Sequence, residues 1–144
     1  MKLIIINGPN LNLLGRRQKD IYGTSDFVSF LKKLQEKYPE IEIDHYQSNV
    51  EGEIVNKIHE VGFSYDGIII NAGGYTHTSI SIADALVAVE TPAIEVHITN
   101  ILTREEFRQI SFIAHACRGT IMGFGLDSYR LGLEGLIEIV RREK

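Results

Sequence analysis

The chain has 144 residues, of which 44% are hydrophobic and 24% are charged, a composition typical of one globular domain spanning residues 1–144. Its formal net charge of -4 excludes the general basic surface that nucleic acids or anionic membranes require. A single cysteine, Cys117, excludes an internal disulfide and fits a reducing cytoplasm.

Short runs of β-branched residues alternate with longer segments of helical periodicity, which predicts repeated strand–helix–strand units. The predicted strands are residues 3–6, 42–46, 67–70, 93–97 and 120–123. The first, third and fifth of these runs are apolar on both faces, as expected of parallel strands that helices cover on both sides. The first run is too short for the core of a signal peptide or for a membrane span, so we interpret it as a buried strand.

Five helices are predicted between and after these strands. They begin at Ser25 or Asp26, at Glu51, at Ser79, after Thr103, and at Asp127 or Ser128. The second ends at Val61, just before Gly62, and the third ends near Val89. The fourth helix is predicted from a capping box, in which the Thr103 and Glu106 side chains would bond reciprocally to backbone N–H groups.

Three of the predicted strands end in polar clusters at residues 7–10, 71–77 and 95–100. The carboxyl ends of parallel strands lie along one edge of an open sheet, where such folds bind ligands. We therefore expect the three clusters to converge on one crevice.

Two of these clusters suggest specific chemistry. Residues 71–74 offer side-chain amides and backbone N–H groups suited to a carboxylate or an oxyanion. Glu95 and His97 are two residues apart in a strand and share a face, and a carboxylate beside an imidazole fixes its tautomer. Taken singly, these features could also be a tight turn and a core histidine; their coincidence at one sheet edge favours an active site.

The segment from residue 9 to residue 23 is long for a connection without regular structure, and such loops often close over sites. It places Arg16, Arg17 and Lys19 near Tyr22. A phenol ionises near pH 10, so a base at neutral pH needs this value lowered by about three units, roughly 4 kcal/mol, which a guanidinium could largely supply. The alternative is a basic loop whose tyrosine packs on its own turn.

Together these motifs resemble those of the type II 3-dehydroquinate dehydratases over essentially the whole chain. The matching segments are residues 7–15, Arg17 with Tyr22 and Gly23, residues 47–49 with 51–52, and residues 71–79, 95–100, 104–108 and 123–125. The resemblance implies an α/β, flavodoxin-like three-layer sandwich with a five-stranded parallel sheet. It also implies a homo-oligomer, a dodecamer built from trimers, with no metal or organic cofactor. The implied reaction is dehydration of 3-dehydroquinate to 3-dehydroshikimate, in the shikimate pathway or in quinate breakdown.

The resemblance also implies catalytic roles. Tyr22, activated by Arg17, matches the base that removes the α-proton of the substrate. His97, oriented by Glu95, matches the acid that protonates the departing hydroxyl. The enolate would be stabilised by a water held by Asn10 and by backbone near Gly73 and Gly74.

Further positions match substrate-binding residues of the family. The substrate carboxylate and the ring hydroxyls would be bound by Asn71, His77, Ile98, Thr99 and Arg108. Asp84 resembles a residue that reaches into a neighbouring subunit's site, and Arg104 resembles one that closes over the pocket.

Two other interpretations remain open. A flavin carrier or phospho-acceptor module can have the same fold, but residues 8–12 lack a hydroxyl-rich phosphate loop, and Asn7 and Asn71 stand where a phospho-acceptor would have aspartates. The second is an inactive scaffold of the same family, against which the match at Arg17, Tyr22 and the other site residues argues.

Some residues are expected to lie away from the chemistry. Residues 127–129 depart from the glycine-containing turn that is usual in the family, and we expect them to touch no catalytic position. We interpret His45, on a predicted edge strand, and His59 as solvated, and Cys117 as a small buried residue.

Overall fold

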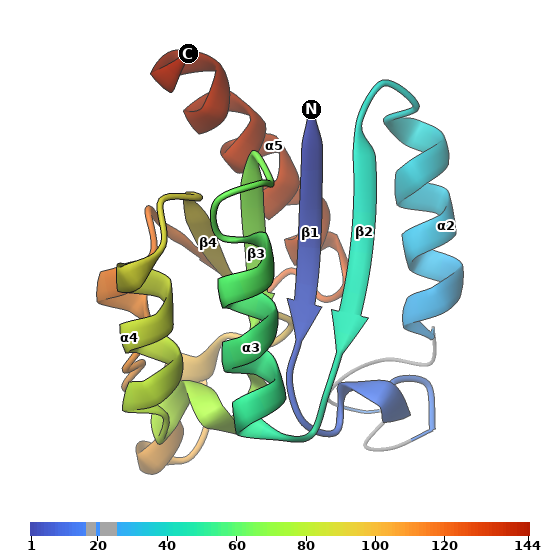
Figure 1. The fold of residues 1–144 in the computed structure, drawn as a ribbon. Coiled ribbons are helices and arrows are strands. Elements are labelled where there is room, and N and C mark those ends of the chain that lie inside the picture. The colour runs from blue at the N-terminus through green and yellow to red at the C-terminus, as the bar shows by residue number, and fades with distance from the viewer. Residues whose placement is uncertain (17–19, 21–25) are drawn as a thin grey trace.

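The computed structural model describes residues 1–16, 20 and 26–144, in which one all-parallel sheet forms the centre of the molecule (Figure 1). The strands follow the order β2-β1-β3-β4-β5 across the sheet. Their bounds are β1 (Lys2–Asn7), β2 (Glu42–Gln47), β3 (Gly67–Asn71), β4 (Ala93–His97) and β5 (Thr120–Met122). The prediction of a five-stranded parallel sheet of the flavodoxin type is confirmed.

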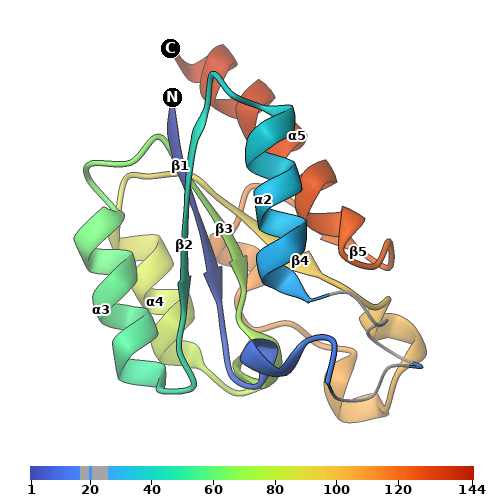
Figure 2. The same ribbon diagram turned by 90° about the vertical axis from the view of Figure 1, so that its right-hand side faces the viewer.

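Helices cover both faces of this sheet (Figure 2). They are α2 (Phe27–Lys37), α3 (Glu51–Val61), α4 (Ile80–Ala88) and α5 (Asp127–Glu143). Helices α2 and α5 lie on one face and α3 and α4 on the other. Among the helices that the structure describes, none combines the length and the apolar character needed to cross a bilayer.

The apolar strands explain why there are two separate cores. Leu3 and Ile5 of β1 pack under α2 and α5, while Ile4 and Ile6 pack under α3 and α4. All four side chains are at most 3% exposed, because successive residues of a strand point to opposite faces and both faces are covered. Burying each such side chain contributes about 1.5–3 kcal/mol, so β1 anchors both layers.

The prediction of a fourth helix after Thr103 is wrong. Single 3-10 turns occupy this region instead: η3 (Ile101–Thr103), η4 (Glu106–Arg108) and η5 (Ala114–Ala116). The hydroxyl of Thr103 donates to the backbone carbonyl of Asn100 at 2.8 Å, so it closes the first turn and does not cap a following helix. Asn100 accepts from the N–H of Leu102, which stabilises that turn further. Local side-chain bonds of this kind compete with helix formation.

The chain order of the strands creates a switch point between β1 and β3. The chain passes from β1 outward to β2 on one side and then returns to β3 on the other side of β1. Connections diverge at such a point and leave a crevice at the carboxyl ends of the two strands. The register pairs Asn7 with Asn71 there, so the two polar ends lie side by side.

Gly8 allows the backbones at these two strand ends to approach closely, so its replacement should destabilise the fold. A Cβ on Gly8 would lie 2.3 Å from the carbonyl oxygen of Ala72, a backbone atom that cannot move aside. We predict that Gly8→Ala lowers the free energy of unfolding by about 1–3 kcal/mol, measured by urea unfolding at fixed protein concentration. Gly52→Ala, with nothing within 4 Å of its Cβ in α3, is the matched control and should be neutral or stabilising. An unchanged stability of Gly8→Ala would contradict this account.

Candidate active site

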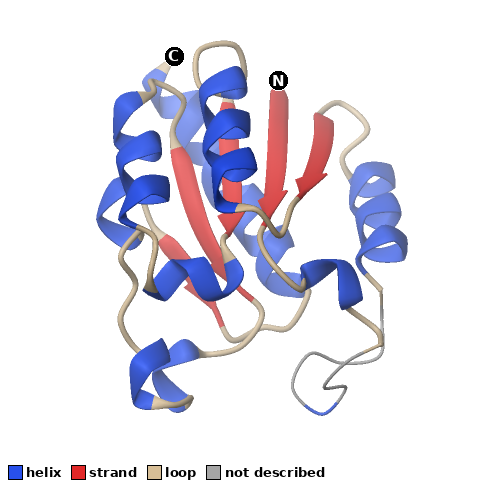
Figure 3. Ribbon diagram, turned by 60° about the horizontal axis from the view of Figure 1, so that its bottom comes forward, coloured by secondary structure: helices blue, strands red, loops and turns tan. Residues whose placement is uncertain are grey.

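The loops after β1, β3 and β4 meet around a cavity of about 140 Å³ at the carboxyl edge of the sheet. Figure 3 brings this edge forward and shows the loops gathered there. The predicted site residues that line the cavity are Asn10, Asn71, Gly73, Gly74, His77, His97, Ile98, Thr99, Arg104 and Arg108. The expectation that the three polar clusters converge is therefore confirmed.

Close backbone contact joins the loops after β1 and β3. The N–H of Gly8 donates to the carbonyl of Asn71 at 2.7 Å. Gly73 has a φ of +59°, and a Cβ there would lie 3.0 Å from the carbonyl oxygen of Pro9. Glycine satisfies both requirements at once, since it tolerates positive φ and adds no side chain. The amide groups of this loop are thus held beside the loop that carries Asn10.

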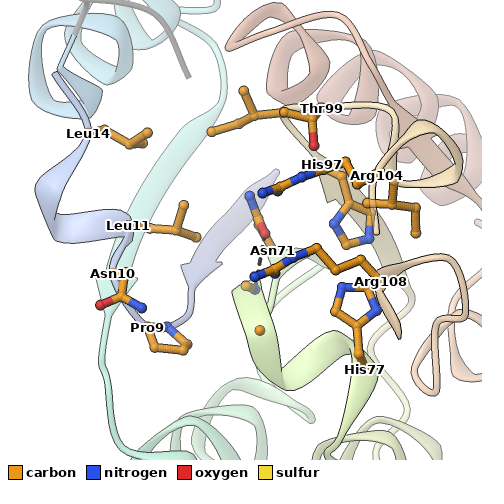
Figure 4. Close-up of a pocket in the computed structure, with 14 residues that line it drawn as sticks. Pro9, Asn10, Leu11, Leu14, Asn71, His77, His97, Thr99, Arg104 and Arg108 are labelled. Carbon is orange, nitrogen blue, oxygen red and sulfur yellow. Dashed lines mark hydrogen bonds between the residues drawn. The ribbon is translucent and has the colours of Figure 1, made fainter. Parts of the chain in front are cut away.

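The end of β2 holds the backbone of Asn10. The N–H of Asn10 donates to Oδ1 of Asn49 at 3.0 Å, and the same oxygen accepts from Nε2 of Gln47 at 3.1 Å. Asn10 itself has a φ of 68°, a left-handed conformation that asparagine adopts more readily than most residues. These contacts fix Asn10 at the exposed rim of the cavity (Figure 4).

Glu95 and His97 form a buried carboxylate–imidazole pair on the wall of the cavity. Oε2 of Glu95 lies 3.3 Å from Nε2 of His97, and Glu95 is fully buried. The hydroxyls of Ser111 and Thr120 also donate to the Glu95 carboxylate. Burial favours a higher pKa for Glu95, but the His97 contact and the two hydroxyls outweigh it and hold the pKa below its usual range. Glu95 is therefore an anion at neutral pH that orients the His97 ring.

His77 lies across the cavity as a neutral acceptor. Its Nδ1 donates to the carbonyl of Ile110 at 2.8 Å, which leaves Nε2 without a proton in the neutral ring. Burial lowers the pKa of His77 below its usual value, and the electrostatic effects of His97 and Arg108 act in the same direction. The Ile110 carbonyl and Glu95 oppose this shift without reversing it. His77 can thus accept a hydrogen bond from a ligand hydroxyl.

Two guanidinium groups extend into the cavity from the turns after β4. Figure 4 shows Arg104 and Arg108 pointing toward Asn71, opposite Leu11 and Leu14. Glu105 lies between the two arginines, with its Oε2 2.8 Å from Nε of Arg108 and 4.0 Å from Nε of Arg104. Planar guanidinium groups bind carboxylates in a bidentate manner, so this side of the cavity suits an anionic ligand.

An apolar wall completes the cavity. Its side chains are Pro9, Leu11, Leu14 and Ile101, and the last three are at most 8% exposed although they border the cavity. Sequence reasoning placed Pro9 in a polar cluster at the crevice but did not assign Leu11, Leu14 or Ile101 to the site. The position of Leu11 and Leu14 in the motif at residues 7–15, and of Ile101 directly after the cluster at residues 95–100, was the available signal.

Other predicted site residues have different locations. Arg17 and Tyr22 lie outside the described residues. Glu95 stands behind His97 and does not itself line the cavity, and Asp84 lies on the exposed face of α4, also apart from the cavity lining. Sequence reasoning missed Ser111 as a partner of Glu95, because nothing in the sequence ties a serine of this irregular stretch to β4.

Residues 127–129 are expected to touch no catalytic position, but Tyr129 contacts a residue that was predicted to bind the substrate. The hydroxyl of Tyr129 accepts a hydrogen bond from Nδ2 of Asn71 at 2.9 Å. His45 is exposed, as expected, but it is not simply solvated. Its ring packs at a tilt against Phe27 with a centroid distance of 4.5 Å, and its Nε2 lies 3.2 Å from Nδ2 of Asn7.

The imidazole of His97, paired with a carboxylate, can carry a proton, and the arginines beside it can hold an anion. Fold and site together define the class: a flavodoxin-like α/β protein whose cavity can hold a small anion beside a histidine that can carry a proton. In residues 1–16, 20 and 26–144, no group of three or more His, Cys, Asp or Glu side chains could hold a metal ion.

Comparison with known proteins gives the family. The sequence model of the family described as dehydroquinase class II matches residues 1–137. A 3-dehydroquinate dehydratase from Campylobacter jejuni is 53% identical over 146 residues, covering 100% of this chain and 92% of the relative. The chain belongs to the class II dehydroquinase family.

Solved structures agree with this assignment. The crystal structure of a type II dehydroquinase from Butyrivibrio crossotus matches with a TM-score of 0.91 at 48% identity, covering 95% of this chain and 97% of that one. A type II dehydroquinase from Propionibacterium acnes matches with a TM-score of 0.86 at 36% identity, covering 97% and 96% of the two chains.

The lowered pKa of Glu95 predicts a pH dependence of stability. Because the pKa is below the ordinary 4.5 in the folded state, the contribution of Glu95 is complete above that pH. It is lost as the pH falls through the lower folded value. Urea unfolding of the wild-type chain should therefore show stability declining below about pH 4.5, and Glu95→Gln should decline less steeply there. Equal slopes for the two proteins would show that Glu95 does not titrate in this way.

Proposed function

We propose that this chain, acting as a single catalytic domain, converts 3-dehydroquinate to 3-dehydroshikimate by elimination of water. The observation that carries the proposal is the buried Glu95–His97 pair, which shares one cavity with Arg104 and Arg108 in a member of this family. The relatives named above take their names from the same substrate.

The reaction requires two proton transfers. The substrate is a ketone with a hydroxyl on its β-carbon and a carboxylate on that same carbon. A base removes the proton from the α-carbon, and the electron pair of that C–H bond forms an enolate. The enolate then expels the β-hydroxyl, which takes a proton and leaves as water. A base, an enolate-stabilising group and an acid are therefore needed around one small ring.

His97 is proposed as the acid. Its Nε2 faces Glu95, so Nδ1 is the nitrogen that would deliver a proton to the departing hydroxyl. The Glu95 carboxylate stabilises the imidazolium form before this transfer. Asn71, which borders the same cavity, would hold the hydroxyl through its side-chain amide.

Tyr22 is proposed as the base, with Arg17 stabilising its phenolate. This assignment rests on the resemblance to the family, and it is supported by the position of Leu14, which lines the cavity shortly before these residues in the chain. A water held by Asn10 and the backbone of Gly73 and Gly74 would face the enolate oxygen.

Substrate binding is assigned to the remaining groups of the cavity. With the Asn71 amide on the departing hydroxyl, the backbone of Ile98 and the backbone and hydroxyl of Thr99 would hold the carboxylate. His77 as an acceptor and Arg108 as a donor would bind ring hydroxyls, and Arg104 would close over the bound substrate. The apolar wall of Leu11 and Leu14 would lie against one face of the ring.

The quaternary structure is proposed to be a dodecamer built from trimers, located in the cytoplasm, without metal or organic cofactor. Ile80 and Val87 are 65% and 62% exposed, and Asp84 stands between them in sequence on the same helix. Residues at this spacing share one face of a helix, so an apolar surface surrounds Asp84. Contact with a second copy would cover this surface and bring Asp84 toward a neighbouring site.

The experiment that tests the function is an absorbance assay. The purified protein is mixed with 3-dehydroquinate, without added metal or cofactor, and the ultraviolet absorbance of the conjugated enone product is followed. We expect a rapid rise that a chelator does not change. A folded, oligomeric protein that produces no rise would contradict the proposal and favour the inactive scaffold.

Replacement of Tyr22 tests the base. Tyr22→Phe keeps the ring and removes the ionisable hydroxyl, so turnover should be abolished while 3-dehydroquinate still binds. Steady-state kinetics measures the first effect, and calorimetric titration with 3-dehydroquinate measures the second. An active Tyr22→Phe enzyme would refute the assignment.

A charge on the apolar face of α4 tests the subunit contact. Val87→Asp would bury a carboxylate in the proposed interface, so sedimentation velocity should show smaller species than the wild type forms. Val28→Asp is the matched control, because Val28 is 78% exposed on α2, and it should leave the size unchanged. An unchanged size of Val87→Asp would rule out this face as the contact.

A further inference from the structure

A series of hydrogen bonds, buried except at its last member, leads from the cavity across three strands. Nδ2 of Asn71 donates to the hydroxyl of Tyr129 at 2.9 Å, and this hydroxyl donates to Oδ1 of Asn7 at 2.8 Å. Nδ2 of Asn7 lies 3.2 Å from Nε2 of His45. Asn71, Tyr129 and Asn7 are 3%, 0% and 1% exposed, so water does not compete for the two bonds of the Tyr129 hydroxyl.

The donor-to-acceptor direction of these hydrogen bonds is fixed at the cavity end. Oδ1 of Asn71 accepts from the N–H of Gly73 at 3.2 Å, and a backbone N–H can only donate. The amide oxygen of Asn71 must therefore face Gly73, and its NH2 group must face Tyr129. One N–H of Asn71 bonds to Tyr129, and the second N–H is left for a ligand in the cavity.

The donor-to-acceptor direction at the His45 end agrees with that at the cavity end. An amide nitrogen can only donate, so Nε2 of His45 must be the unprotonated acceptor. Desolvation of the ring lowers the pKa of His45 below its usual value, in agreement with a neutral ring. Burial raises the pKa of Tyr129 well above its usual value. Tyr129 therefore stays a neutral phenol, which can accept from Asn71 and donate to Asn7 at the same time.

Helix α5 places the Tyr129 ring deep in the core. The ring packs against Phe27 and Phe30, with centroid distances of 5.0 and 6.1 Å. Further along α5, Gly132 lies so close to β4 that a Cβ there would be 2.7 Å from Cγ2 of Val96. A phenylalanine at position 129 would make the same ring contacts, so packing alone does not require the hydroxyl. Its bonds to the two asparagines do.

We infer that Tyr129 is a positioning residue, which orients the Asn71 amide so that its second N–H meets the departing hydroxyl of the substrate. The inference rests on the proposed dehydration. Tyr129 does not line the cavity, so its effect on turnover passes through Asn71. Without the phenol, the NH2 group of Asn71 loses the acceptor that holds it in place.

The test is a double-mutant cycle on the full chain with 3-dehydroquinate. Tyr129→Phe should lower kcat about tenfold, the size expected for one buried hydrogen bond, and change KM less. Asn71→Ala with Tyr129→Phe should be no slower than Asn71→Ala alone, because Tyr129 acts through Asn71. A merely structural role would not produce this lack of additivity.

Thr91→Val is the matched control. Thr91 lies just before β4, at the end of the sheet opposite the cavity. Its buried hydroxyl bonds to the backbone carbonyls of Val61 and Tyr65. Its loss should lower stability and leave kcat unchanged. Wild-type kcat in Tyr129→Phe, or additive losses in the double variant, would overturn the inference.

A measurement on the wild-type chain decides the case if Tyr129→Phe does not fold, and it is independent of turnover. In protein labelled with 15N-asparagine, hydrogen exchange is followed by NMR at the side-chain amide of Asn71. One of the two Nδ2 protons should exchange slowly, because it is buried in the bond to Tyr129. Rapid exchange of both protons would overturn the inference. Absence of turnover in the wild type would instead contradict the proposed function.

Discussion

The site depends on the close approach of the backbone after β1 to the backbone after β3. Gly8 bonds to the carbonyl of Asn71 and passes Ala72 at a distance that no side chain would permit. This contact sets Asn7 beside Asn71 and brings Gly73 against Pro9. The switch in strand order supplies a crevice at this edge, and the join gives the crevice its amide groups and its apolar wall.

The site also depends on the buried negative charge of Glu95, which the fold must stabilise. An isolated Glu95 carboxylate in the core would destabilise the folded state. Hydrogen bonds from two hydroxyls and the contact with the His97 imidazole offset this loss. The anion in turn orients the acid proposed for the reaction. The arginines of the later turns face the same cavity, so one site combines a proton carrier with a binding surface for an anion.

Sequence reasoning predicted the parts of the structure that local periodicity and strand geometry determine. The bounds of α3 and the contact between Glu95 and His97 follow from a helical repeat and from the shared face of residues two apart. The helix expected after Thr103 failed because side-chain bonds from Asn100 and Thr103 close single turns. The role of Tyr129 could not be predicted, since its partners lie 122 and 58 positions away in the chain.

The central claim is that the cavity beyond β1, β3 and β4 binds 3-dehydroquinate for elimination. A crystal structure of the protein with this compound tests it most directly. We expect the ring against Leu11 and Leu14, with its carboxylate at Ile98 and Thr99 and the β-hydroxyl near His97 and the Asn71 amide. Binding outside this cavity, or a pose that directs the β-hydroxyl away from His97, would contradict the account.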